Sequence, residues 1–241
     1  MGCGMKTKTM ELPTKKVKAS RKSPKNMIIY GAPKIGKTTV LSQLDNCLII
    51  DLEEGSDMID ALKIKVKNLK ELEEVGRTII KKGKPYKYIA IDTISKLEEW
   101  CEGLGKEIYM KTPMGKNFDT KNPGMSILAL PNGAGYLYLR MAYKKWIDRL
   151  NLLADHVILV AHLKDKMLEK KGKEVAVKDL DLTGKIKQIT CANADAVGYI
   201  YREEEKTMIS FDSLDDSVAG SRCEHLKGTT MPLDWSKIFI D

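Results

Sequence analysis

Short, largely apolar segments recur along the chain, and each is followed by a glycine, an acid or a histidine. These segments occupy residues 26–30, 47–51, 87–92 and 156–161. Apolar runs of this length, bounded by polar residues, are typical of strands buried in a parallel sheet. Segments that favour helix follow them, at residues 39–44, 68–82, 94–109 and 136–154.

This alternation of strands and helices predicts the fold class. A sheet whose strands are separated by helices is mostly parallel and carries helices on its faces. Two further runs, 196–201 and 208–211, have the spacing of a hairpin at the edge of a sheet. We therefore predict one α/β domain with a mostly parallel twisted sheet, flanked by helices and closed by a β-hairpin.

A phosphate-loop motif follows the first predicted strand. Residues 31–38 read GAPKIGKT and match G-x-x-x-x-G-K-[ST] at each fixed position. In such a loop, glycines let backbone N–H groups point at phosphate oxygens, the lysine bridges the β- and γ-phosphates, and the threonine hydroxyl ligates Mg²⁺. We expect ATP and Mg²⁺ as ligands. The predicted nucleotide-binding residues are Gly31, Ala32, Pro33, Lys34, Ile35, Gly36, Lys37, Thr38 and Thr39.

Acidic residues stand at the ends of the second and third predicted strands. Asp51, Glu53 and Glu54 follow one strand, and Asp92 closes the other. Because the carboxyl ends of parallel strands share the edge at which open α/β sheets bind ligands, Asp92 is placed to hold Mg²⁺ through water. The predicted metal residues are therefore Thr38 and Asp92.

Charge divides the chain into an arm and a body. The 241 residues have a formal charge of +8, from 41 Lys and Arg against 33 Asp and Glu. Residues 1–26 hold eight basic side chains and one acid, so the remaining 215 residues sum to only +1. We predict a basic arm at 1–25 that contacts DNA or a neighbouring subunit, ahead of a core at 26–241.

Two lysine-rich stretches, 111–135 and 163–181, lie between the predicted elements of the core. Long connections of this kind in compact domains are functional or mobile, and we predict mobile loops. Lysine contacts to phosphates would give DNA binding that is independent of sequence and sensitive to salt. The candidate DNA-binding residues are Lys116, Lys121, Lys164, Lys166, Lys170, Lys171 and Lys173.

Cysteine usage and hydropathy bear on the compartment. The five cysteines are scattered and form no C-x₂₋₄-C pair, which argues against a disulfide framework or a zinc ribbon. The sequence contains no run approaching the roughly 18 apolar residues of a membrane span. We expect a cytoplasmic protein without a membrane partner.

The ordered set of motifs resembles the RecA-type ATPase core, most closely the compact recombinase and single-strand-annealing ATPases that phages encode. The resemblance covers roughly residues 26–212. It rests on GAPKIGKT (31–38), IDLE (50–53), IAIDT (89–93), VILVAH (157–162) and LTGK (182–185).

This resemblance implies roles for individual residues. Glu53 stands where the family's catalytic glutamate orients or deprotonates the attacking water, with Glu54 as its rival. His162 takes the place of a polar side chain that senses the γ-phosphate. Arg222 lies in the region from which family members send a basic residue to the nucleotide of a neighbouring subunit, and Lys227 is the second candidate. The two lysine-rich stretches match the family's DNA-binding loops in position.

The implied function is an ATP-dependent recombinase or annealing protein that binds single-stranded DNA. Its ATPase would be stimulated by single-stranded DNA, and its oligomers or filaments would hold ATP between protomers. The expected partners are single-stranded DNA, further copies of the chain and an ssDNA-binding protein. The alternatives are a RecA-like ATPase switch similar to a helicase loader, a P-loop small-molecule kinase, and a nucleotide-binding scaffold that scarcely hydrolyses.

Overall fold

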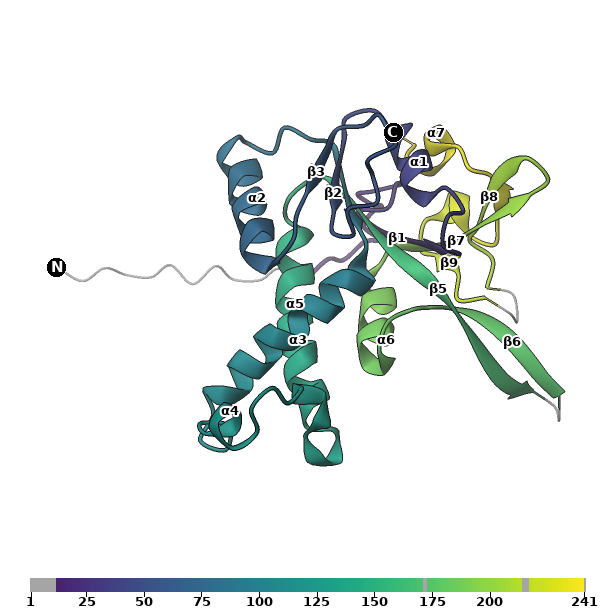
Figure 1. Cartoon of the computed structure of the whole chain (residues 1–241). Helices are drawn as coiled ribbons and strands as arrows, with labels where there is room; N and C mark the ends of the chain where they lie inside the picture. Colours follow the sequence, from purple (N-terminus) through teal and green to yellow (C-terminus); the bar gives the residue numbers. More distant parts are fainter. Residues whose placement is uncertain (1–11, 171–172, 214–216, 241) are drawn as a thin grey trace.

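The computed structural model describes residues 12–170, 173–213 and 217–240, and for residues 166–176 it describes the backbone alone. The described residues form one mixed sheet with helices on both faces (Figure 1). The strands are β1 (Asn26–Gly31), β2 (Cys47–Asp51), β3 (Lys63–Lys65), β4 (Tyr88–Asp92), β5 (His156–Lys170), β6 (Lys173–Leu180), β7 (Ala196–Glu203), β8 (Lys206–Ser210), β9 (Gly220–Ser221) and β10 (Thr230–Pro232). The helices are α1 (Lys37–Ser42), α2 (Leu69–Lys81), α3 (Ile94–Met110), α4 (Phe118–Lys121), α5 (Gly135–Leu150), α6 (Gly184–Asn193) and α7 (Trp235–Ile238).

The strand order across the sheet is β10-β8-β7-β1-β5-β4-β2-β3. Strands β3, β2, β4, β5, β1 and β7 pair in parallel, whereas β8 and β10 continue the sheet antiparallel. The predicted fold class is confirmed: this is a RecA-like α/β sheet with antiparallel C-terminal strands. The order places β1 between β5 and β7, so the loop that follows β1 has a neighbouring strand on either side.

Side chains from the two faces of the sheet form two cores. On one face, alternate strand residues such as Ile28, Ile91 and Leu159 pack against α2, α3, α5 and α6. On the other face, residues such as Ile29 and Val160 pack against α1 and the C-terminal segment. Strands buried on both faces have no polar face, which is why these segments are continuous apolar runs in the sequence.

The C-terminal segment is fastened to the helix of the phosphate loop. In α7, the indole Nε1 of Trp235 donates to the carbonyl oxygen of Val40 in α1, at 2.7 Å. Trp235 also stacks on Phe239, and both side chains are buried in the core that α1 covers. This contact gives the short helix α1 an anchor besides its own backbone hydrogen bonds.

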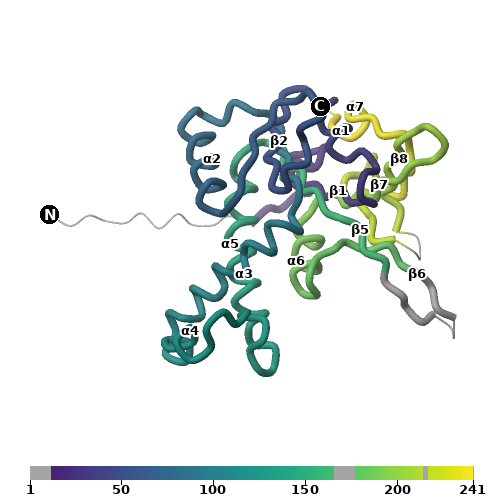
Figure 2. Tube along the Cα trace, viewed as in Figure 1, coloured from purple at the N-terminus to yellow at the C-terminus, as the bar shows by residue number. Residues whose placement is uncertain are grey.

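Residues 111–135, predicted as a loop, contain α4 and two short 3₁₀ helices at Ile127–Ala129 and Pro131–Gly133. They connect α3 and α5, which project together from the sheet; Figure 2 traces the chain out along α3 and back along α5. Tyr109, Phe118 and Ile127 form a small core at the tip. A Cβ at Gly135 would lie 1.8 Å from the carbonyl oxygen of Ile127, so the backbone there packs closely. The predicted mobility of this segment stays a prediction.

The loop predicted at 163–181 is wrong as secondary structure. Strand β5 continues past His162 to Lys170 and pairs antiparallel with β6, from Leu163 opposite Leu180 to Lys170 opposite Lys173. Figure 1 shows this pair extending beyond the main sheet. The lysines and acids of the segment concealed it, because strand pairing is made by backbone groups and tolerates charged side chains on exposed strands.

Each helix within the described residues is too short or too polar to span a lipid bilayer.

Candidate nucleotide site

The phosphate loop connects β1 to α1 at the carboxyl edge of the sheet. A Cβ at Gly31 would lie 2.4 Å from the carbonyl oxygen of Ile200 in β7, so only glycine lets the two strands approach this closely. Lys34 and Gly36 have positive φ values of 62° and 99°, and Gly36 is the N-cap residue of α1. The backbone therefore turns sharply twice before the helix starts at Lys37.

Lys37 lies folded against this loop. Its Nζ donates to the carbonyl oxygens of Gly31 at 3.0 Å and Ala32 at 2.9 Å, and the residue is 6% exposed. Burial lowers the pKa of Lys37, although the charges of Asp92 and Glu53 oppose the shift. A buried ammonium group with two neutral acceptors is suited to exchange them for the oxygens of a phosphate.

The two predicted metal residues lie in direct contact. The Thr38 hydroxyl donates to Oδ2 of Asp92 at 2.6 Å, although the residues are 54 positions apart in the sequence. Burial raises the pKa of the Asp92 carboxyl, and the hydrogen bond from Thr38 partly offsets that shift. A hydroxyl and a carboxylate are oxygen ligands of the kind that Mg²⁺ takes alongside water and phosphate oxygens.

This donor set fits a metal carried by a nucleotide. Among the described residues, three or more His, Cys, Asp or Glu side chains do not gather anywhere in an arrangement that could hold a metal ion. Mg²⁺ is commonly bound by one or two protein oxygens plus substrate phosphates, and Thr38 and Asp92 supply those two.

Glu53 is held beside this pair by two hydrogen bonds. Thr93, which follows Asp92, donates through Oγ1 to Oε1 of Glu53 at 2.6 Å. His162 in β5 approaches the same carboxylate with Nε2 3.0 Å from both oxygens. The Glu53 and His162 side chains are 34% and 29% exposed, so the carboxylate is fixed in position and still open to solvent.

The neighbouring acids have other partners. The Asp51 carboxylate is buried and accepts hydrogen bonds from the backbone and hydroxyl of Ser56 and from the backbone of Glu53. Glu54 has a positive φ of 59°, and its carboxylate lies 3.6 Å from Nζ of Lys67. Of the two rival glutamates, the structure therefore brings Glu53 to the phosphate loop and turns Glu54 toward Lys67.

Arg222 lies away from the phosphate loop of its own chain. Its guanidinium donates to the carbonyl oxygen of Ala192 and lies 3.9 Å from Asp195, which in turn accepts from the backbone of Asn26 at the start of β1. Arg222 is thus near the amino end of β1, whereas the loop is at its carboxyl end. Lys227, the second candidate, pairs with Glu224. Either residue would reach a nucleotide only on another copy of the chain.

The lysines predicted to contact DNA are dispersed over two projections. Lys116 and Lys121 are exposed at the tip between α3 and α5. Lys164 lies just beyond His162, with Nζ 3.3 Å from Asp181. Lys171 lies outside the described residues, as do the side chains of Lys166, Lys170 and Lys173.

One participant in the site was missed by sequence reasoning. Thr93 was quoted only as the residue after the strand-end Asp92, yet its hydroxyl orients Glu53. A polar residue directly after a carboxylate at a strand end is the signal that could have found it, since both lie at the ligand-binding edge of the sheet. The peptide bond between Asp92 and Thr93 is cis.

The sequence matches a known family over most of its length. The model of the family described as AAA domain matches residues 23–223. No curated protein matches the sequence. Among solved structures, the chain is similar to the RadB recombinase at 12% identity, with a TM-score of 0.42 and 90% of each chain covered. It is also similar to a KaiC-like protein of the hyperthermophilic archaeon Pyrococcus horikoshii OT3 at 12% identity, with a TM-score of 0.41, 89% of this chain and 87% of the other being covered.

Proposed function

The chain belongs to the AAA domain family of P-loop NTPases, and from that premise we propose that it hydrolyses ATP with Mg²⁺ and uses the cycle to bind single-stranded DNA as a recombinase or annealing protein. One observation carries the hydrolytic part: Glu53, fixed by Thr93 and His162, stands beside the Thr38–Asp92 pair at the phosphate loop. A solvent-accessible carboxylate held in this way is suited to activate water.

Each residue of the site has a part in this proposal. The backbone of residues 31–37 and the ammonium of Lys37 bind the phosphates, while Thr38 and Asp92 hold Mg²⁺. When bound, Mg²⁺ neutralises charge that develops on the phosphate oxygens. Glu53 orients the attacking water and takes its proton, and Nε2–H of His162 stabilises the carboxylate by donating a hydrogen bond.

Strand β5 offers a route from the nucleotide to DNA. His162 contacts Glu53, and the same strand continues without interruption into the hairpin that carries Lys164 and the further candidate lysines. A change in the contacts of His162 would therefore act on the hairpin through backbone hydrogen bonds. In this proposal nucleotide and DNA affinities are linked, and each ligand raises the affinity for the other.

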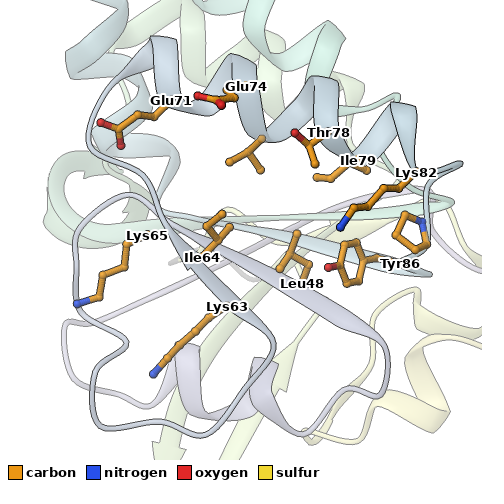
Figure 3. Close-up of a pocket in the computed structure, with 12 residues that line it drawn as sticks. Leu48, Lys63, Ile64, Lys65, Glu71, Glu74, Thr78, Ile79, Lys82 and Tyr86 are labelled. Carbon is orange, nitrogen blue, oxygen red and sulfur yellow. The ribbon is translucent and has the colours of Figure 1, made fainter.

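Self-association is a second part of the proposal. Strand β3 ends the sheet within the described residues, so its outer backbone groups face no further strand there. A cavity of about 470 Å³ adjoins it, and Figure 3 shows apolar Leu48, Ile64 and Ile79 between the strand and α2. We propose that an extended arm segment of a second copy pairs with this edge. The arm carries exposed Leu12 and Val17, which would fill the cavity.

The ATPase rate with and without single-stranded DNA, together with particle mass by light scattering, tests this function. We expect DNA to raise the rate and ATP to raise the mass. A monomer whose ATPase ignores DNA would overturn the recombinase proposal while leaving ATP hydrolysis intact. An ssDNA-binding protein remains a predicted partner, to be sought in the same assay by its effect on DNA-stimulated turnover.

The lysines at the helical tip permit a more local test of DNA binding. If Lys116 and Lys121 each neutralise a phosphate, replacing both with alanine lowers the magnitude of the log–log salt slope by about 1.4. Lys70→Ala with Lys81→Ala removes the same charge from exposed positions of α2 and is the matched control. Equal salt slopes for the two double variants would exclude the tip from the DNA interface.

A further inference from the structure

A second cavity adjoins the phosphate loop on the side away from the catalytic carboxylates. Its volume is about 500 Å³, within the range of small-molecule sites. Ala32 and Ile35 of the loop form one wall, and the remaining described residues that line it are Lys178, Tyr199, Ile200, Tyr201, Arg202, Ser210, Ser217 and Thr230. We propose that this cavity receives the base and ribose of the nucleoside triphosphate and that Tyr201 is its principal base-contacting residue. The proposal rests on the nucleotide binding proposed above.

The strand order gives the bound nucleotide a direction. β1 lies between β5 and β7, and the γ-phosphate contacts proposed for Glu53, Asp92 and His162 all come from the β5 side. In β7, Ile200 is level with Gly31, the first residue of the phosphate loop. A triphosphate whose γ end faces the carboxylates therefore extends its nucleoside end toward β7, where the cavity lies.

Aromatic rings lead from the core into this cavity. The Tyr30 and Tyr199 ring centroids are 5.3 Å apart, and those of Tyr199 and Tyr201 are 5.4 Å apart with an angle of 20° between the rings. Tyr30 is fully buried, while Tyr199 and Tyr201 are partly exposed. A flat base placed against Tyr201 would extend this series, and stacking of a base on an aromatic ring suits every base because each has a π face.

Charge and hydroxyl groups fit the rest of a nucleoside phosphate. Lys178 Nζ lies 5.3 Å from the centroid of the Tyr199 ring, and Arg202 also lines the cavity. None of the described lining residues is acidic, in contrast to the opposite side of β1. The hydroxyls of Ser210 and Thr230 lie 2.8 Å apart and form a polar pair within reach of a ribose.

This composition predicts the specificity of the site. Recognition by stacking depends on ring area, so purine nucleotides bind more tightly than pyrimidine nucleotides, and ATP and GTP differ little. By the same reasoning, inorganic tripolyphosphate binds through the loop alone and more weakly than ATP.

The test compares the affinities of ATP, CTP and tripolyphosphate for the full chain and its Tyr201 variants, by calorimetry with Mg²⁺ present. Tyr201→Leu is expected to weaken ATP binding roughly five- to hundredfold, the loss of one stacking contact, and to leave tripolyphosphate binding unchanged. Tyr201→Phe keeps the ring and should retain wild-type affinity. Tyr86→Leu, which alters a tyrosine at the distant cavity beside α2, is the matched control.

The ligands separate failure of this inference from failure of the proposed function. If the wild-type chain binds ATP no more tightly than tripolyphosphate, or Tyr201→Leu binds ATP as wild type does, the base lies elsewhere and the inference is overturned while nucleotide binding stands. If neither ATP nor tripolyphosphate binds the wild-type chain, the proposed function fails and the inference fails with it. Preserved melting temperatures confirm that each variant is folded.

Discussion

The two flanks of strand β1 differ in chemistry although both face the same phosphate loop. On the β5 flank, hydrogen bonds fix the carboxylates: Thr38 holds Asp92, and Thr93 with His162 holds Glu53. On the β7 flank, stacked tyrosines and two cations surround a cavity whose described lining residues include no acid. The first flank is suited to stabilise a reacting phosphate, and the second is suited to recognise a nucleoside.

This difference teaches that turnover and affinity can be altered separately. Interactions made only in the transition state change kcat, whereas interactions made equally in the ground state change affinity. Substitutions on the carboxylate flank should therefore lower turnover with little effect on ATP affinity, and those on the tyrosine flank should do the reverse.

Glu53→Gln is expected to have the largest effect, because it removes the proposed base and keeps the shape of the side chain. Turnover should fall about 10²- to 10⁴-fold while ATP affinity is retained. Steady-state kinetics and calorimetry measure the two quantities. Glu54→Gln, at the carboxylate that faces Lys67, is the matched control and should keep wild-type turnover. If instead Glu54→Gln stops turnover and Glu53→Gln does not, the assignment is reversed.

Gly31→Ala tests the close contact that joins the two flanks. The added Cβ would lie 2.4 Å from the Ile200 carbonyl oxygen, a backbone atom that moves only with its strand. We expect a loss of about 1–3 kcal/mol in the free energy of unfolding, from overpacking. Urea denaturation measures it. Gly55→Ala is the control, since its Cβ would meet no atom within 4 Å. Equal stability of the two variants would show that β1 and β7 tolerate separation.

His162→Ala separates orientation of Glu53 from its chemistry. The variant removes one of the two groups that hold the carboxylate and leaves the hydrogen bond from Thr93. We expect turnover to fall about tenfold, the value of one charge-assisted hydrogen bond. His162→Gln supplies an amide donor and should restore most of the rate. Failure of the glutamine to rescue turnover would mean that His162 acts otherwise than by donating to Glu53.

Asp92→Asn should give the smallest effect, in stability and not in turnover. Burial raises the pKa of this carboxyl in the folded state, so its ionisation destabilises the fold once the pH exceeds the unfolded value of about 3.9. Without nucleotide or metal, the variant should therefore melt at a higher temperature than wild type at neutral pH. The difference should disappear below about pH 4, where both side chains are neutral. A variant that melts lower at neutral pH would contradict this sign.

The central strands and longer helices were predictable because their burial is written in the sequence. The apolar runs at 26–30 and 47–51 correspond to β1 and β2, and the helix predicted at 68–82 corresponds to α2 at Leu69–Lys81. Side chains buried on both faces of a sheet, or on one stripe of a helix, leave a periodic signal that needs no knowledge of the tertiary fold.

The remaining structure depends on contacts between distant residues. Strand β3 has the sequence Lys-Ile-Lys and exists through its pairing with β2. The contact between His162 and Glu53 joins residues 109 positions apart and follows from the register of the strands, which the sequence does not display. The same holds for the tip at 111–135, whose glycines and prolines resemble a loop until a small local core gathers them.

The hydrogen bond from Trp235 to Val40 bears on how the protein is made. The donor follows its acceptor by 195 residues in the chain, and a ribosome adding about 5–20 residues per second needs roughly 10–40 s to produce that interval. During this time the helix of the phosphate loop has been synthesised without its C-terminal anchor. A nascent chain therefore completes its nucleotide-binding helix late, and truncation before Trp235 would leave that helix with no such partner.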